Sequence, residues 1–116
     1  GIAMVKPGNR VSYVSHAVEQ AVKGAGCSVV REYVGHGVGR ELHEEPQIPN
    51  YGLPGRGPLL KQGMTFCIEP MVNLGRADVE VLSDRWTVVT RDSRPSAHFE
   101  HTVAVIDGGV EILTKL

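Results

Sequence analysis

Two acidic side chains lie inside segments that otherwise have the composition of buried β-strands. Glu69 falls within Thr65–Pro70, and Glu100 falls within Ser96–Thr102. Burying a carboxylate is expensive unless it is paired with a cation or bound to a metal ion. The fold of this chain must therefore bring a positive partner to both carboxylates, and one shared metal ion would satisfy both.

A third segment, Gly35–Pro46, supplies nitrogen donors. It places His36 and His43 seven residues apart among glycines and acids. We therefore predict that His36, Glu69 and Glu100 meet around a divalent ion. One imidazole and two carboxylates suit Mn, Fe, Co or Zn better than they suit a thiolate-bound structural zinc. Three protein ligands with open positions are typical of a catalytic site.

Strand periodicity extends this set of candidates. Alternate residues share one face of a strand, which groups Thr65 with Cys67 and Glu69, and His98 with Glu100 and Thr102. We therefore expect His98 beside the metal, where it hydrogen-bonds a ligand or lines the substrate site. His101 should point to the opposite face and act as a structural hydrogen-bonding group, and Cys67 is expected to be a small packing residue.

The remaining sequence predicts an α+β fold, in which an amphipathic helix packs on a curved, mostly antiparallel sheet. Apolar residues recur at helical spacing from Val11 onward, with Ser12 as the cap and glycines at 24 and 26 as the stop. His16 lies in this helix and is expected to be structural. Strands are expected at 27–34, 64–74, 85–90 and 98–106, and a hairpin turn at 107–109 leads to a last strand at 110–113. Residues 45–61 are rich in Pro and Gly and are expected to form a long loop.

Composition excludes several partners. The net charge of -1 gives no electrostatic reason to expect nucleic acid or an anionic membrane. No apolar stretch approaches the roughly 20 residues that span a bilayer, and we expect a cytoplasmic location. Cys27 and Cys67 have no paired spacing, which favours reduced thiols over a disulfide.

Two catalytic motifs are incomplete in Gly35–Pro46. The alternating glycines lack the phosphate-binding pattern and are not followed by a predicted helix. The pair His43-Glu44 would need a second histidine at position 47, which is Gln47, and Pro46 would disrupt that helix. Two interpretations of His43 remain. It is either a proton or hydrogen-bond donor that faces the metal, or a loop histidine whose hydrogen bonds are purely structural. Two interpretations of Trp86 also remain: it lines a substrate pocket, or it fills the core.

Four ordered motifs together resemble one family: Tyr33–Gly39, Leu42–Pro46, Gly63–Val72 and His98–Thr102. They are similar to the carboxyl-terminal half of type I methionine aminopeptidases, and the resemblance runs over almost all of residues 1–116. It implies half of a pita-bread fold, whose two pseudo-symmetric halves enclose two divalent ions. It also implies an enzyme that hydrolyses the first peptide bond of methionyl peptides or nascent polypeptides.

The resemblance implies a role for each matching residue. His36 and Glu69 would bind one metal ion, Glu100 would bridge both, and Glu69 would also shuttle a proton. His43 would contact the substrate at the scissile peptide. The methionine pocket would be walled by Leu42, where relatives often carry an aromatic residue, and by Trp86.

Two aspartates and a further histidine of that family belong to the amino-terminal half, and nothing in this chain matches them. We therefore expect residues 1–116 to begin near the join between the halves, to bind at most one ion alone, and to be inactive without a companion half. Two alternatives are a proline-directed pita-bread peptidase and a non-catalytic module that kept the fold. A third is an isolated half-domain that self-associates through its exposed interface.

Overall fold

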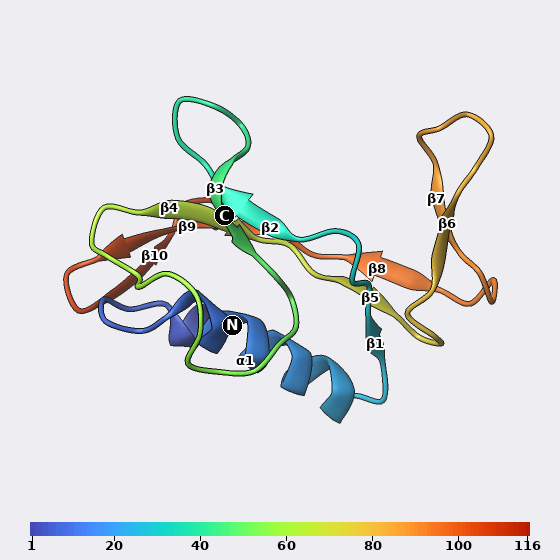
Figure 1. Cartoon of the computed structure of the whole chain (residues 1–116), viewed down its shortest axis with the longest axis horizontal. Helices are drawn as coiled ribbons and strands as arrows, with labels where there is room; N and C mark the ends of the chain where they lie inside the picture. Colours follow the sequence, from blue (N-terminus) through green and yellow to red (C-terminus); the bar gives the residue numbers. More distant parts are fainter.

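The computed structural model describes all 116 residues and packs one α-helix against antiparallel sheets (Figure 1). A 3-10 turn, η1 (Ile2–Met4), precedes the helix α1 (Val11–Gly24). Ten strands follow: β1 (Ser28–Val29), β2 (Gly35–Gly37), β3 (Glu44–Ile48), β4 (Thr65–Ile68), β5 (Met71–Asn73), β6 (Val79–Val81), β7 (Val88–Thr90), β8 (Ser96–His98), β9 (His101–Ile106) and β10 (Gly109–Ile112). They form sheets of order β10-β9-β4-β2-β3, β1-β5-β8 and β6-β7. The predicted α+β arrangement is confirmed.

The helix α1 covers the larger sheet with its apolar face. Its buried side chains, Val11, Val14, Ser15, Val18 and Val22, recur at three- and four-residue spacing. They pack in one core with strand residues that include Ile48, Phe66, Val103 and Val105. The helix ends at Gly24, as predicted.

The predicted helix cap is wrong. Arg10 is the N-cap residue and makes no side-chain capping bond. Ser12 lies inside the first turn, where its hydroxyl accepts a hydrogen bond from the backbone N–H of Arg56. A tertiary contact to the long 49–61 segment therefore uses the hydroxyl that local capping would have used.

Two predicted strands are each interrupted at their carboxylate. The chain leaves β4 at Glu69-Pro70 and continues as β5, and it leaves β8 at Phe99-Glu100 and continues as β9. A proline has no N–H for a ladder bond, and the carbonyl of Pro70 accepts the N–H of Phe99. Both interruptions lie where the paired strands pass from the three-stranded to the five-stranded sheet. Glu69 and Glu100 therefore lie at a corner between sheets.

The other predicted boundaries also shift. Only Ser28–Val29 of the expected strand 27–34 pairs, and only Val88–Thr90 of 85–90 does. The expected loop 45–61 begins inside β3, which is the outer strand of its sheet. Pro46 is tolerated there because an edge strand need not donate every N–H. The hairpin at Asp107-Gly108 is confirmed, with Gly108 in the left-handed region at φ 69°.

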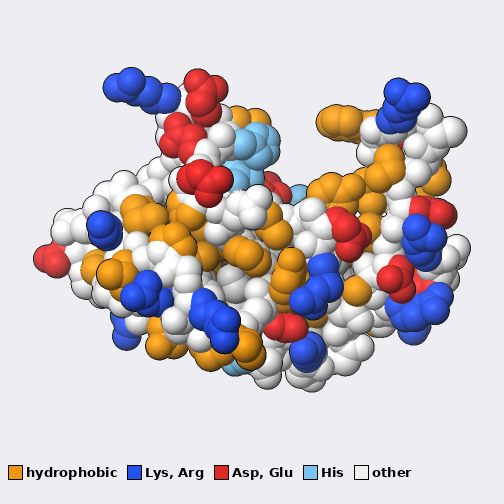
Figure 2. All heavy atoms as spheres, in the orientation of Figure 1, with side chains coloured by type: hydrophobic (Ala, Val, Ile, Leu, Met, Phe, Trp, Pro, Cys, Tyr) orange, Lys and Arg blue, Asp and Glu red, His pale blue; other side chains and the backbone are white.

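Two projections rise from the same side of the sheets, opposite to α1 (Figure 1). One is the connection between β2 and β3, and the other is the β6–β7 hairpin. A wide hollow separates them, and histidine side chains gather on the face of the first projection that borders the hollow (Figure 2). No helix in the structure combines the length and hydropathy that crossing a membrane requires.

Candidate metal centre

His36 is positioned by two close backbone approaches on β2. A Cβ atom at Gly35 would overlap the carbonyl of Cys67 on β4, and one at Gly37 would overlap the carbonyl of Glu45 on β3. Glycine at both positions therefore lets β2 lie tightly between its neighbours. His36, between them, is left facing Glu69.

The hydrogen bonds of His36 define what its second nitrogen can do. Nδ1 lies 3.0 Å from the carbonyl of Gly37, which can only accept, so Nδ1 carries a proton. Nε2 lies 3.1 Å from Oε1 of Glu69. In the neutral imidazole these two atoms present lone pairs to each other, an arrangement that requires a proton or a metal ion between them.

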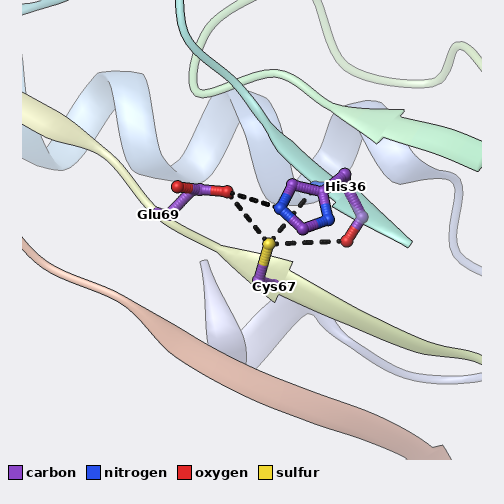
Figure 3. Close-up of side chains that lie close together, drawn as sticks. All are labelled: His36, Cys67 and Glu69. Carbon is purple, nitrogen blue, oxygen red and sulfur yellow. Dashed lines mark hydrogen bonds and ion pairs between the residues drawn. The ribbon is translucent and has the colours of Figure 1, made fainter. Parts of the chain in front are cut away.

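The thiol of Cys67 contacts the carboxylate of Glu69 (Figure 3). Its Sγ accepts the N–H of His36 at 3.4 Å and lies 3.1 Å from Oε1 of Glu69. Burial, and then the hydrogen bond to Glu69, raises the pKa of the Cys67 thiol to about 12. The thiol therefore keeps its proton and donates it in a hydrogen bond. The expected packing role was incomplete, and the two-residue spacing between Cys67 and Glu69 was the signal for this contact.

The other oxygen of Glu69 faces a second imidazole. His98 Nε2 lies 3.4 Å from Oε2 of Glu69. The ligand atoms of Glu69, His98 and Glu100 lie within 4.8 Å of one another, as do those of His36, Cys67 and Glu69. No such group contains both His36 and Glu100. The predicted trio is thus present as two overlapping groups that share Glu69.

His43 lies beside His36 on the first projection. Their ring centroids are 4.0 Å apart at an interplanar angle of 42°. Both line a pocket of about 380 Å³, whose other walls include Glu44, Glu45 and Gln47. The structure thus places His43 next to His36, and its role toward a metal ion or substrate stays a prediction. His98 lines a separate pocket of 280 Å³ with valines of β6 and β7.

Leu42 and Trp86 are surface residues. Leu42 is 70% exposed, and Trp86 is 87% exposed on the β6–β7 hairpin. The alternative that Trp86 fills the core is therefore wrong. The backbone N–H of Trp86 donates to Asp84, which orders the turn that carries it. Neither side chain is enclosed within this chain.

The two remaining histidines and both cysteines behave as structural groups. His101 Nδ1 lies 2.8 Å from the hydroxyl of Thr114, which is the structural hydrogen bond expected of this side chain. His16 Nδ1 lies 3.0 Å from the carbonyl of Gly52. Cys27 and Cys67 are free thiols.

The donor atoms at this corner fit a first-row divalent ion. Imidazole nitrogens and carboxylate oxygens converge from β2, the β4–β5 joint and the β8–β9 joint. The unshared lone pairs of His36 Nε2 and Glu69 Oε1 face each other, which a bound cation would resolve. The protonated Cys67 thiol argues against a thiolate site.

The family model for metallopeptidase family M24 matches residues 1–107. The chain belongs to metallopeptidase family M24. It is 56% identical over 116 residues to methionine aminopeptidase 1 of Bacillus subtilis and 50% identical over 114 residues to methionine aminopeptidase of Salmonella typhimurium. The match to the Bacillus subtilis protein includes 100% of this chain and 47% of that protein. The match to the Salmonella typhimurium protein includes 98% of this chain and 43% of that protein. This M24 chain thus spans about half the length of the curated relatives it matches.

Solved structures show the same fold for this M24 chain. The crystal structure of methionine aminopeptidase from Thermotoga maritima superposes with a TM-score of 0.96 at 56% identity, over 99% of this chain and 46% of that one. Prolidase from Pyrococcus furiosus superposes with a TM-score of 0.71 at 26% identity, over 99% and 28%. The expected resemblance to methionine aminopeptidases is confirmed, and the fold is the carboxyl-terminal half of the pita-bread fold.

Proposed function

We propose that this chain supplies one half of the active site of a methionine aminopeptidase, which removes N-terminal methionine by hydrolysing the first peptide bond. The observation that carries the proposal is Glu69, whose two oxygens lie 3.1 Å from His36 Nε2 and 3.4 Å from His98 Nε2. Similarity to methionine aminopeptidases over the whole chain supports it.

We assign the metal ligands to His36, Glu69 and Glu100. A divalent ion held here would polarise a carbonyl and lower the pKa of water toward neutrality. Co, Mn, Fe or Zn fits the donor set, with two ions in the complete site and at most one in this half alone. Glu100 would help to hold the ions of the complete site.

The chain's own residues would then move protons and hold the substrate. Glu69 accepts a proton from the attacking water and returns it to the leaving amine. His43, beside His36, donates a hydrogen bond to the charge that develops at the scissile peptide. A fixed hydrogen-bond donor of this kind stabilises developing charge most strongly where water is excluded. The second half of the enzyme would exclude water from the site.

The substrate would lie in the hollow between the two projections. Leu42 on one projection and Trp86 on the other have exposed apolar side chains, which would wall the pocket for the methionine side chain. His98 lines the pocket between the β6–β7 hairpin and the three-stranded sheet, from which it would contact the peptide. Methionyl peptides or nascent polypeptides are the proposed substrates, in the cytoplasm.

Residues 1–116 would act with a companion half, because the remaining ligands of the site have no match in this chain. Without it we expect no peptidase activity. The exposed apolar residues at the rim of α1 and β9, such as Phe99, would then favour self-association. A proline-directed specificity is the weaker alternative, since identity is 56% to the Thermotoga aminopeptidase and 26% to the prolidase.

Peptide cleavage by the reconstituted enzyme tests the proposal. The chain is mixed with a polypeptide carrying the other half of a close relative, Mn²⁺ or Co²⁺ is added, and methionine release is measured by mass spectrometry. Release should need both halves and should be lost with Glu69→Gln. Preferential cleavage of an X-Pro peptide would favour the prolidase-like alternative, and no cleavage of either peptide by a folded complex would contradict the proposal.

A further inference from the structure

The thiol of Cys67 contacts two different residues of the proposed metal centre. Its Sγ lies 3.1 Å from Oε1 of Glu69, and it accepts the backbone N–H of His36 at 3.4 Å. The carbonyl of His36 lies 3.5 Å from the same sulfur. Cys67 therefore links the backbone of the residue that carries the imidazole to the side chain that carries the carboxylate (Figure 3).

This contact lies where β2 and β4 share little backbone pairing. The two strands have one paired position, Gly37 with Phe66, and β2 shifts its register against β3 between His36 and Gly37. The N–H of His36 points toward β4 and is accepted there by a side chain. A backbone N–H that is shielded from water needs an acceptor, so the sulfur does more than fill space.

Among the side chains around Glu69, Cys67 is the fully buried donor. Its exposed fraction is 0%. His36 faces Oε1 with the nitrogen that would bind an ion, and His98 faces Oε2 from a side chain that is 42% exposed. A carboxylate oxygen has two lone pairs. Oε1 can therefore accept the S–H proton and still bind an ion.

We propose that Cys67 is a positioning residue of the metal centre, whose S–H···Oε1 hydrogen bond fixes the carboxylate of Glu69 in the orientation that faces His36. The inference rests on the metal centre proposed above, and it adds a residue that does not bind the ion. Because the sulfur also holds the backbone of His36, it sets the separation between the imidazole and the carboxylate. Removing an outer hydrogen bond of this kind typically lowers metal affinity or activity by about 10- to 100-fold.

Infrared spectroscopy of the 116-residue chain tests the hydrogen bond directly. The S–H stretching band lies where other protein groups do not absorb, and it moves to lower frequency when the thiol donates to a stronger acceptor. Cys27→Ala leaves Cys67 as the single thiol. In that background we expect Glu69→Gln to move the band to higher frequency, because a neutral amide oxygen is a weaker acceptor than a carboxylate. Glu32→Gln, at an exposed position, should leave the band unchanged.

A matched pair of substitutions tests the positioning role. Cys67→Ala removes the donor and the acceptor, whereas Cys67→Ser keeps both in a side chain nearly as small as alanine. We expect the Co²⁺ affinity of the chain, measured by calorimetry, to fall about ten-fold or more in Cys67→Ala. Most of that loss should be recovered in Cys67→Ser. Circular dichroism checks that both variants are folded, and the band shift needs no substitution at Cys67.

A band that Glu69→Gln does not move would overturn the proposal. Equal Co²⁺ affinities of Cys67→Ala and wild type, or no Co²⁺ binding by the folded wild-type chain, would overturn it as well. An affinity that stays low in Cys67→Ser would also do so, because the sulfur itself would then be needed as a metal ligand.

The proposed peptidase function is decided separately, by methionine release from the reconstituted enzyme. The expected band shift and affinities without methionine release would support the role of Cys67 and contradict that function alone. Methionine release with an unmoved band would contradict the role of Cys67 alone.

Discussion

Cys67 Sγ lies 3.1 Å from Oε1 of Glu69, and the Cys67 side chain is wholly buried in β4. Burial, followed by the contact with Glu69, raises the pKa of the thiol to about 12 from an ordinary value of 9.0. The folded chain therefore keeps a proton on Cys67 at pH values where the unfolded chain has lost it.

This difference predicts a loss of stability in alkali. Above pH 9 the unfolded state binds fewer protons than the folded state, so the free energy of unfolding falls as pH rises from about 9 toward 12. Urea unfolding at pH 8 and pH 10.5 measures the fall. Cys67→Ala, which has no thiol to titrate, should show a smaller fall than wild type. Equal falls in the two proteins would contradict the assignment of the raised pKa.

A second ionisable group ties the helix to the 49–61 segment. Glu19 accepts the N–H of Gly52 at 2.8 Å and pairs with Lys23 at 2.9 Å. The Gly52 N–H first, and then Lys23, lowers the pKa of Glu19 below its ordinary value of 4.5. Its stabilisation is therefore present above pH 4.5 and is lost as the pH falls through the lowered pKa.

Glu19→Gln should accordingly reduce the free energy of unfolding by about 1 kcal/mol at pH 7, because the hydrogen bond loses its charged acceptor. The difference from wild type should shrink at pH 3, measured by urea unfolding at both values. Glu32→Gln, at an exposed position, is the matched control and should be close to wild type. A deficit of Glu19→Gln that is the same at both pH values would refute the charge-based explanation.

Because β2 packs tightly against its neighbours, we predict that replacing its glycines lowers the free energy of unfolding. A Cβ atom at Gly37 would overlap the carbonyl of Glu45, so Gly37→Ala should cost about 2 kcal/mol or more of unfolding free energy. Gly24→Ala is the control, because a Cβ there meets no atom within 4 Å. Thermal unfolding of both variants gives the comparison. A Gly37→Ala chain as stable as Gly24→Ala would show that β2 and β3 are not held this closely.

The exposure of Trp86 separates its contribution to stability from its contribution to substrate binding. The side chain is 87% exposed, so Trp86→Ala should change the free energy of unfolding by less than about 0.5 kcal/mol. In the reconstituted enzyme the same change should raise KM for a methionyl peptide by about ten-fold, since apolar contact is lost. Leu113→Ala, also at an exposed residue, should leave KM unchanged. An unchanged KM for Trp86→Ala would remove Trp86 from the pocket.

Local sequence patterns predicted the chemistry of the corner better than its geometry. Alternation along a strand correctly placed Cys67 beside Glu69, and the expected structural hydrogen bond of His101 is made to Thr114. It could not reveal that both strands break at their carboxylates, because that break depends on a hydrogen bond between Pro70 and Phe99, which are distant in sequence.

Chain segments whose structure depends on distant partners were also predicted poorly. β3 forms because Gln47 and Ile48 pair with β2, and this pairing overrides the Pro-rich composition of the segment. Ser12 bonds to Arg56 and not to its own helix. The exposure of Trp86 could not be read from a single aromatic residue, because it depends on where the β6–β7 hairpin projects.

The central claim is that Glu69 is the shared donor of a divalent metal centre. Calorimetric titration of the 116-residue chain with Mn²⁺ or Co²⁺, compared with Glu69→Gln, tests it most directly. Because Glu69 belongs to both donor groups, we predict binding of one ion to wild type and none to Glu69→Gln, with circular dichroism showing that the variant is folded. Equal binding by the two proteins, or no binding by wild type, would contradict the account.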